Sequence, residues 1–175
     1  LVTADGRRSL ALIPGMFRGR EKGSAHAFVQ VVDPARPWVD YERFPVDAFS
    51  GAPDAFNLSI GLQRFGLAGV RVDLPGCRGQ VRFGALAPWP VTRAAPGVMG
   101  WYAWMPFMQC YHGVVSLDHR LEGQLEVRGE TLDFTGGRGY IEKDWGVSFP
   151  KRRGGMPPNP YEDERASAAA SGADG

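Results

Sequence analysis

The residues best suited to chemistry in this chain lie in one short segment, Gly139–Pro150, with the sequence GYIEKDWGVSFP. It places Glu142 and Asp144 two positions apart, with Lys143 between them and Trp145 after them. Side chains of an extended strand alternate between its faces, so the two carboxyl groups lie on one side, about 7 Å apart. In a cavity, mutual repulsion and desolvation would raise the pKa of at least one and create a general acid near neutral pH.

The same pattern has a structural alternative, in which the strand is solvated and the carboxylates pair with Lys143 and Arg138. The sequence alone leaves both interpretations open. Tyr140 falls on the same side of the strand as the carboxylates. It is therefore a candidate for contacting a substrate if the segment lines a cavity.

Histidines provide further candidates. His112 is a candidate proton donor, or a hydrogen-bonding residue without a catalytic role. Cys110-Tyr111-His112 followed by His119 is not a spacing typical of zinc sites, so no metal site is predicted. Ser116 lies close to His119 but lacks the surrounding G-x-S-x-G motif of a nucleophile elbow, so a hydrolase triad is not predicted.

Aromatic and thioether side chains gather between residues 99 and 108. Trp101, Trp104 and Phe107 alternate there with methionines. Such a cluster could line a pocket for a long apolar ligand, or it could fill a core or plug the end of a barrel. Together with Trp145, these residues are the predicted substrate contacts in the first case.

The rest of the chain reads as short strands separated by turn residues, with no helical period lasting three turns before residue 160. Strand starts about 8 to 14 residues apart favour an all-β, antiparallel barrel or sandwich. Pro14-Gly15 is predicted to be a turn, and residues 84–100 a long connection. The predicted strands are 9–13, 26–32, 41–44, 56–62, 70–74, 80–83, 113–117, 121–127 and 131–134.

Composition limits the function classes. The 175 residues, 43% hydrophobic and 22% charged, predict one globular domain, and a net charge of +1 argues against nucleic-acid binding. No apolar stretch reaches the roughly 20 residues of a transmembrane helix, although peripheral membrane contact stays open. No signal peptide is visible, so the default location is cytoplasmic. The spacing of Cys77 and Cys110 does not show whether they pair.

The composition changes beyond Lys151, where turn residues and then alanine, serine and glycine dominate. We therefore expect residues 1–150 to form the β-barrel-like domain and residues 151–175 an irregular or disordered tail.

Three segments together resemble the tocopherol cyclase family, its broader bacterial branch in particular. They are ALIPGMF…HAFVQVVD (11–33), MPFMQCYHGVVSLDHRLEGQL (105–125) and GRGYIEKDWGVSFPK (139–151), of which the last is the most specific. The resemblance covers residues 8–151. Family members usually have an aromatic-rich segment before the first match and a second half after the last, so we expect this chain to be a fragment.

The resemblance implies a lipocalin-like β-barrel and cofactor-free ring closure of a prenylated hydroquinone to a chromanol. That chemistry needs a proton delivered to an alkene and π-rich walls around a developing cation. Glu142 or Asp144 is the expected acid, and Trp145 with Trp101 or Trp104 the expected walls. The rival hypothesis is a non-catalytic carrier of an apolar isoprenoid, which needs the aromatic pocket but no proton donor.

Overall fold

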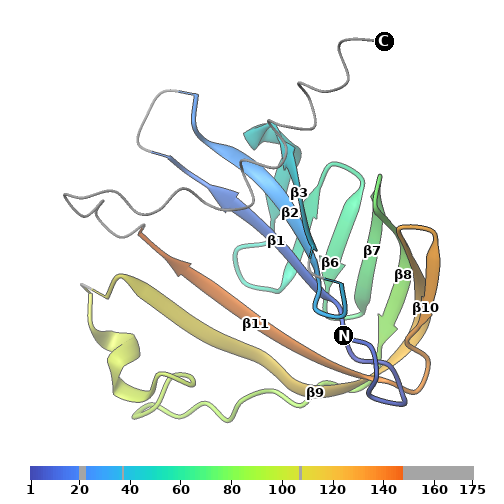
Figure 1. Ribbon diagram of the computed structural model, residues 1–175. Coiled ribbons are helices and arrows are strands. Elements are labelled where there is room, and N and C mark those ends of the chain that lie inside the picture. Colours follow the sequence, from blue (N-terminus) through green and yellow to red (C-terminus); the bar gives the residue numbers. More distant parts are fainter. Residues whose placement is uncertain (20–22, 37, 107, 148–175) are drawn as a thin grey trace.

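The computed structural model describes residues 1–19, 23–36, 38–106 and 108–147, which form antiparallel β-structure with two short 3-10 helices (Figure 1). One sheet has the order β1-β2-β3, and a larger one has the order β10-β9-β8-β7-β6-β5-β4, with β11 also paired to β9. The all-β antiparallel prediction is confirmed, and the described strands form an open sandwich instead of a closed barrel. The bounds are β1 Ala11–Phe17, β2 His26–Asp33, β3 Trp38–Phe44, η1 Val46–Ala48, β4 Phe49–Gly51, β5 Asn57–Ile60, β6 Gln63–Gly66, β7 Gly69–Leu74, β8 Cys77–Phe83, η2 Gly100–Trp104, β9 Cys110–Val127, β10 Glu130–Asp133 and β11 Arg138–Gly146.

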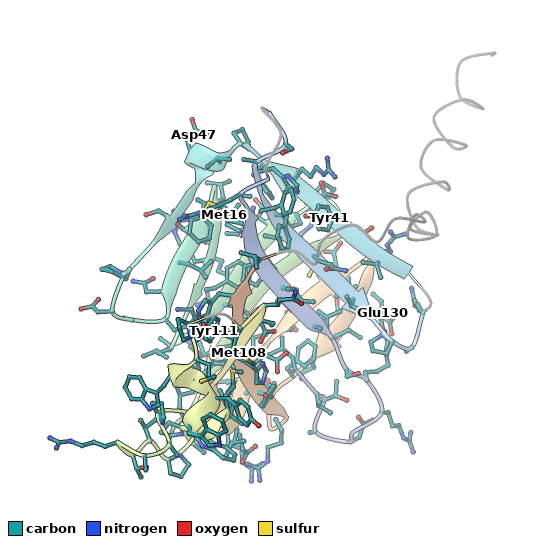
Figure 2. All side chains as sticks on the ribbon, turned by 90° about the vertical axis from the view of Figure 1, so that its left-hand side faces the viewer. Met16, Tyr41, Asp47, Met108, Tyr111 and Glu130 are labelled. Carbon is teal, nitrogen blue, oxygen red and sulfur yellow. The ribbon has the colours of Figure 1, made fainter. Side chains whose placement is uncertain are left out.

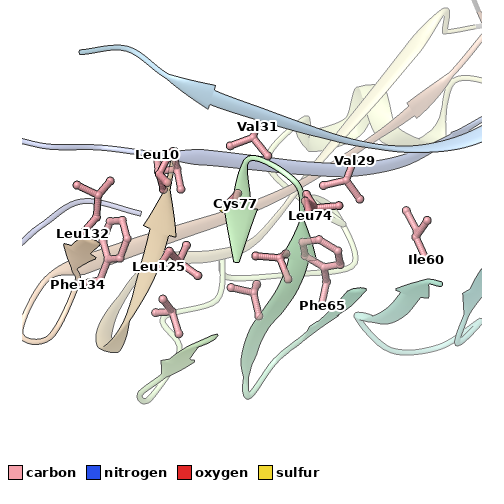
Figure 3. Packing of buried hydrophobic residues seen from close by; sticks show 14 of the residues in the cluster. Leu10, Val29, Val31, Ile60, Phe65, Leu74, Cys77, Leu125, Leu132 and Phe134 are labelled. Atoms are coloured by element: carbon pink, nitrogen blue, oxygen red, sulfur yellow. The ribbon is translucent and has the colours of Figure 1, made fainter. Parts of the chain in front are cut away.

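The core lies between the two sheets (Figure 3). On β2 every second residue is buried, and Val29 and Val31 face the larger sheet. On β9 burial follows the alternation of apolar and polar residues in the predicted strand 121–127: Leu125 and Val127 are buried, and Glu126 between them is exposed. This period of two follows from the pleat, which sends successive side chains to opposite faces.

The predicted turn at Pro14-Gly15 is wrong, because both residues lie inside β1, paired with β2. β1 pairs on one side only in the described chain, and a proline is tolerated on such an edge strand, where its missing N–H breaks no ladder bond. Gly15 is required by packing, since the ring of Phe28 on β2 occupies the space of its missing Cβ. The dipeptide Pro14-Gly15, which is common in turns, therefore lies within an edge strand in this structure.

Two other boundaries differ from the prediction. Residues 56–62, expected as one strand, contain only β5 before a turn at Gly61, where φ is +57°. Residues 113–117 and 121–127, expected as two strands, belong to the single 18-residue strand β9. The long connection predicted at 84–100 carries no strand over residues 84–99 and leads into η2.

Ion pairs link the two sheets at one end of the sandwich. Arg8 donates to the buried Asp33 of β2 at 2.8 Å and to Glu130 of β10 at 2.6 Å. Arg128 donates to Asp40 of β3 at 2.5 Å. Because Asp33 also accepts from a backbone N–H, its buried carboxylate is fully partnered, as a buried charge must be.

Leu125→Ala should lower the free energy of unfolding by about 2–5 kcal/mol, because Leu125 is fully buried between the sheets and its loss leaves a cavity. Leu117→Ala is the matched control: that side chain is 45% exposed on the same strand and should cost under about 0.5 kcal/mol. Urea denaturation measures both, and equal effects would contradict the assigned burial.

Candidate functional site

The predicted site segment is β11, and it pairs along the first half of β9 to form a two-stranded ribbon (Figure 1). Asp144 lies directly opposite His112, and Glu142 opposite Val114. The N–H of Val147 donates to the carbonyl of Gln109, and the two kinds of antiparallel pair alternate from there. His112 and Asp144 therefore form a non-hydrogen-bonded pair, the kind that holds side chains closer together.

The register that brings His112 to Asp144 depends on two irregularities. The pairing shifts by one residue between Gly139 and Ile141, and again between Ile141 and Glu142. Both shifts place an extra residue on β9, as in a β-bulge, which re-aims side chains along a strand. Without them, Asp144 would face a residue two positions away from His112.

His112 sits between the two carboxylates. Its Nδ1 is hydrogen-bonded to Asp144 Oδ1, and its Nε2 lies 3.7 Å from Glu142 Oε2. The hydrogen bond to Asp144, followed by the negative charges of Asp144 and Glu142, raises the pKa of His112 above 6.5. The structure thus brings all three predicted catalytic residues, His112, Glu142 and Asp144, together in one cluster, which we call the His112 cluster.

The His112 cluster lies on the solvent side of the ribbon. Glu142 and Asp144 are about half exposed, so neither lies inside an enclosed cavity. Tyr140, on the same face and half exposed, has its pKa raised by desolvation and then by its hydrogen bond to Glu142. The alternative partners expected from the sequence lie elsewhere, since Arg138 binds Asp118 and Lys143 lies over the Trp145 ring at 5.3 Å.

Trp145 occupies the other face of the ribbon. It follows Ile141 and Lys143 on β11, and Ile141 is buried on the core side. Its ring stacks on Tyr111 with centroids 5.5 Å apart and planes at 8°. Trp145 and the carboxylates therefore point to opposite sides of β11, and this strand pair does not place Trp145 beside the His112 cluster.

Trp101 and Trp104 belong to η2, which precedes β9 in the chain, and Figure 2 labels Met108 and Tyr111 on either side of the start of β9. Trp101 is 57% exposed and Trp104 66% exposed, so neither fills the core. The Tyr111 hydroxyl donates to the Met105 carbonyl, and the His112 N–H points at the sulfur of Met99 at 3.1 Å. Phe107 lies outside the described residues.

The structure brings a second histidine, His119, to Ser116, the pair for which the sequence predicts no hydrolase triad. Ser116 Oγ lies 3.0 Å from His119 Nδ1 in the buried face of β9, and the hydroxyl donates to the Asp118 carbonyl. His119 Nε2 has no partner among the described residues, and its edge fills the space above Gly139. Desolvation lowers the pKa of His119, whereas the pKa of His112 is raised. Residues three positions apart face opposite sides of a regular strand, so the contact between Ser116 and His119 depends on the register shift between them.

Three further features of the described chain bear on function: a surface hollow, the two cysteines and the length of the helices. One hollow of about 650 Å³ lies over β8 and β9, lined by Arg82, Phe83 and Arg120 among others, away from the tryptophans. Cys77 and Cys110 are both free; burial raises the pKa of the Cys77 thiol to about 12. Within the described residues, no helix has the length and apolar character needed to span a membrane.

Comparisons with protein-family models, curated proteins and solved structures give no match for this chain.

Asp144→Asn should lower the pKa of His112, because it removes the first of the interactions that favour the imidazolium. The stability supplied by these contacts is fully present below pH 6.5 and is lost as the pH rises through the higher folded pKa. NMR titration of His112 measures the pKa, and urea denaturation at several pH values measures the stability.

Glu122→Gln is the control for this titration, since Glu122 is an exposed carboxylate of β9 paired with Arg82. It should leave the pKa of His112 unchanged. Equal titration curves for wild type and Asp144→Asn would contradict the assigned contact.

Gly139→Ala should destabilise the fold by about 1–3 kcal/mol, because the added methyl group meets the His119 ring. In a His119→Ala background the same change should cost less, since the ring is gone, and a double-mutant cycle measures this coupling. Gly97→Ala, with open space around the added atom, is the control. A cost for Gly139→Ala that is independent of His119 would refute the contact.

Proposed function

We propose that this chain is a tocopherol-cyclase-like protein in which the His112 cluster provides the acid and base for closing a prenylated hydroquinone to a chromanol. The observation that supports the proposal is the position of His112 between two carboxylates, with its pKa raised by the Asp144 hydrogen bond. A charged imidazole can donate a proton, and a neighbouring carboxylate can accept one. No redox cofactor or metal is needed for this reaction.

The reaction neither consumes nor releases a net proton, because the cluster gives up one proton and takes one back. The His112 imidazolium gives its proton to one alkene carbon as the π bond breaks. The phenol oxygen bonds to the other, tertiary carbon and releases its proton to Glu142. Glu142 lies 3.7 Å from His112 Nε2, so the proton then returns across this short gap and restores the starting state. The product is an isomer of the substrate.

Asp144 has a positioning role in this proposal. Its carboxylate holds Nδ1 of His112, which leaves Nε2 directed toward Glu142 and the substrate. A histidine whose second nitrogen is held by a carboxylate keeps a fixed tautomer and ring orientation. The aromatic group on this face is Tyr140, whose ring is the nearest candidate on β11 for contacting the developing cation.

One observation favours the rival function of a non-catalytic carrier. The stacked Tyr111 and Trp145 rings lie on the face of the ribbon opposite the carboxylates, where Trp145 is half exposed. An isoprenoid bound there would meet aromatic surface without a proton donor. The two hypotheses thus use opposite faces of the same strand, which makes them separable by mutation.

Cyclisation of a prenylated hydroquinone, followed by chromatography of the chromanol, tests the proposal. His112→Gln should lower the turnover rate about 10²–10⁴-fold, the usual contribution of a general acid, with binding changed only a few-fold. The Glu142→Gln, Asp144→Asn double variant should behave similarly, and Glu122→Gln should retain full activity. The wild-type rate should fall as the pH rises through the pKa of His112, because the neutral imidazole cannot donate.

Tryptophan fluorescence on titration with the same hydroquinone separates the alternatives. Wild type that binds without cyclising, and loses binding on Trp145→Ala, would establish the carrier. His112→Gln that cyclises at the wild-type rate would exclude His112 as the acid, and a double variant that does so would exclude the roles of Glu142 and Asp144. Circular dichroism of each variant checks that the fold is retained.

A further inference from the structure

The first register shift of the ribbon lies between Ser116 and His119 on β9. Gly139 of β11 pairs with His119. Ile141 pairs with Ser116, so two residues of β9 lie between these pairs where β11 has one. The extra residue of such a bulge has no partner on the opposite strand, so other contacts must fix its place. This shift is the first of the two that set the register of the His112 cluster.

A hydrogen bond between two buried side chains spans this bulge. Ser116 Oγ lies 3.0 Å from His119 Nδ1, and neither residue is more than 1% exposed. Phe83 of β8 packs on the His119 ring, with ring centroids 4.5 Å apart. Because residues three positions apart lie on opposite faces of a regular strand, the bond forms only while the bulge is in place. The bond and the bulge therefore stabilise each other.

The backbone of the bulge is bound from its other edge by Ala87, in the connection between β8 and η2. The N–H of Leu117 donates to the Ala87 carbonyl at 2.7 Å, and the Ala87 N–H donates to the Asp118 carbonyl at 3.1 Å. The same Ala87 N–H lies 3.3 Å from Ser116 Oγ. The Ser116 hydroxyl therefore joins this backbone anchor to the His119 ring.

The partners of the Ser116 hydroxyl determine where His119 carries its proton. The hydroxyl donates to the Asp118 carbonyl at 3.0 Å, because a carbonyl can only accept. With its single hydrogen used there, Oγ accepts the bond from His119 Nδ1. A neutral imidazole has one N–H, so Nε2 is bare. Among the described residues Nε2 has no partner, and it lies against Gly139.

Protonation of His119 conflicts with this packing. It puts a hydrogen on Nε2, which already fills the space that a Cβ of Gly139 would take. The new N–H has no acceptor in the described surroundings, and a buried donor without an acceptor destabilises the state that contains it. The charged ring is therefore favoured where β11 has moved away from it.

The charges around His119 agree with a neutral ring in the folded chain. Desolvation is the largest cause that lowers its pKa, the positive charge of the Leu1 amine lowers the pKa further, and Asp118 raises it. The Asp118 carboxylate is paired with Arg138 of β11 at 2.5 Å. The charged residues next along β8 and β9 are Arg82, Arg120 and Glu122. Since the pKa lies below 6.5, the neutral imidazole predominates at pH 7.

We propose that Ser116 and His119 are positioning residues of the His112 cluster: their hydrogen bond holds the bulge that brings Asp144 opposite His112, and protonation of His119 releases it. Neither residue touches the cluster, so both act through the register of β11 on β9. The cluster is then assembled above the pKa of His119, and His112 is charged below its own, higher pKa. The consequence for catalysis rests on the proposed function.

Two substitutions of His119 separate the hydrogen bond from the ring. His119→Asn keeps an N–H that can reach Ser116 but cannot take up a proton, whereas His119→Phe keeps a ring and loses the donor. NMR titration should find the pKa of His112 still raised in His119→Asn. In His119→Phe it should fall toward 6.5, because Asp144 no longer lies opposite His112. Ser116→Ala should give the same fall.

A purely structural role would lower the stability of these variants without moving the pKa of His112 in the folded protein. The same His112 pKa in wild type, His119→Phe and Ser116→Ala would therefore overturn the positioning role. So would a fall in His119→Asn that is absent from His119→Phe, because the ring alone would then hold the register.

Hydrogen exchange of the wild-type chain tests the release by protonation. The amides of Lys143 and Trp145, paired with Gly113 and Tyr111 of β9, report opening of the ribbon. Between pH 7 and pH 5 their protection factors, corrected for intrinsic exchange, should fall by up to about tenfold for each unit by which folding lowers the pKa of His119. His119→Asn should remove this fall. Constant wild-type protection, or an equal fall in His119→Asn, would overturn the release.

The pH profile of cyclisation distinguishes failure of this inference from failure of the proposed function. The wild-type rate should fall below the pKa of His119, and His119→Asn should keep its rate there. If the His112 pKa responds as expected and no variant or wild type cyclises, only the proposed function fails. If wild type cyclises and His119→Phe does so equally well with an unchanged His112 pKa, only the positioning role fails.

Discussion

The whole molecule depends on the backbone pairing of one strand, β9. Its second half pairs with β8 on one edge and β10 on the other, and supplies Leu121, Leu125 and Val127 to the core. Its first half continues past the sandwich and pairs with β11. A single extended backbone therefore joins the packed core to the exposed ribbon, and every candidate residue of the ribbon is positioned relative to the core through it.

The same side-chain type has opposite chemistry at two places on this strand. His119 is enclosed against Phe83, with ring centroids 4.5 Å apart, and desolvation favours its neutral form. His112 is one-third exposed between two carboxylates, which favour its charged form. Seven positions separate them. The contrast follows from the environment of each ring, because burial destabilises the charged imidazolium and nearby carboxylates stabilise it.

The sequence predicted the parts of this structure that depend on local alternation. The all-β class, the amphipathic half of β9 and the shared face of Glu142 and Asp144 follow from a period of two. The meeting of His112 with these carboxylates does not, because it requires two register shifts that no local pattern specifies. The sequence did not predict that Trp101 and Trp104 are exposed, because apolar composition shows which residues prefer burial and not which ones have a packing partner. The proline within β1 was misread because turn propensity says nothing about which edge of a strand is unpaired.

The two cysteines give this chain a built-in means of chemical labelling. Cys77 is buried and its thiol pKa is about 12, so it forms almost no thiolate at neutral pH and reacts slowly. Cys110 is exposed at the first position of β9, two residues before His112. A maleimide fluorophore would consequently attach at Cys110 without any substitution. Its emission would report on the ribbon while leaving the core untouched.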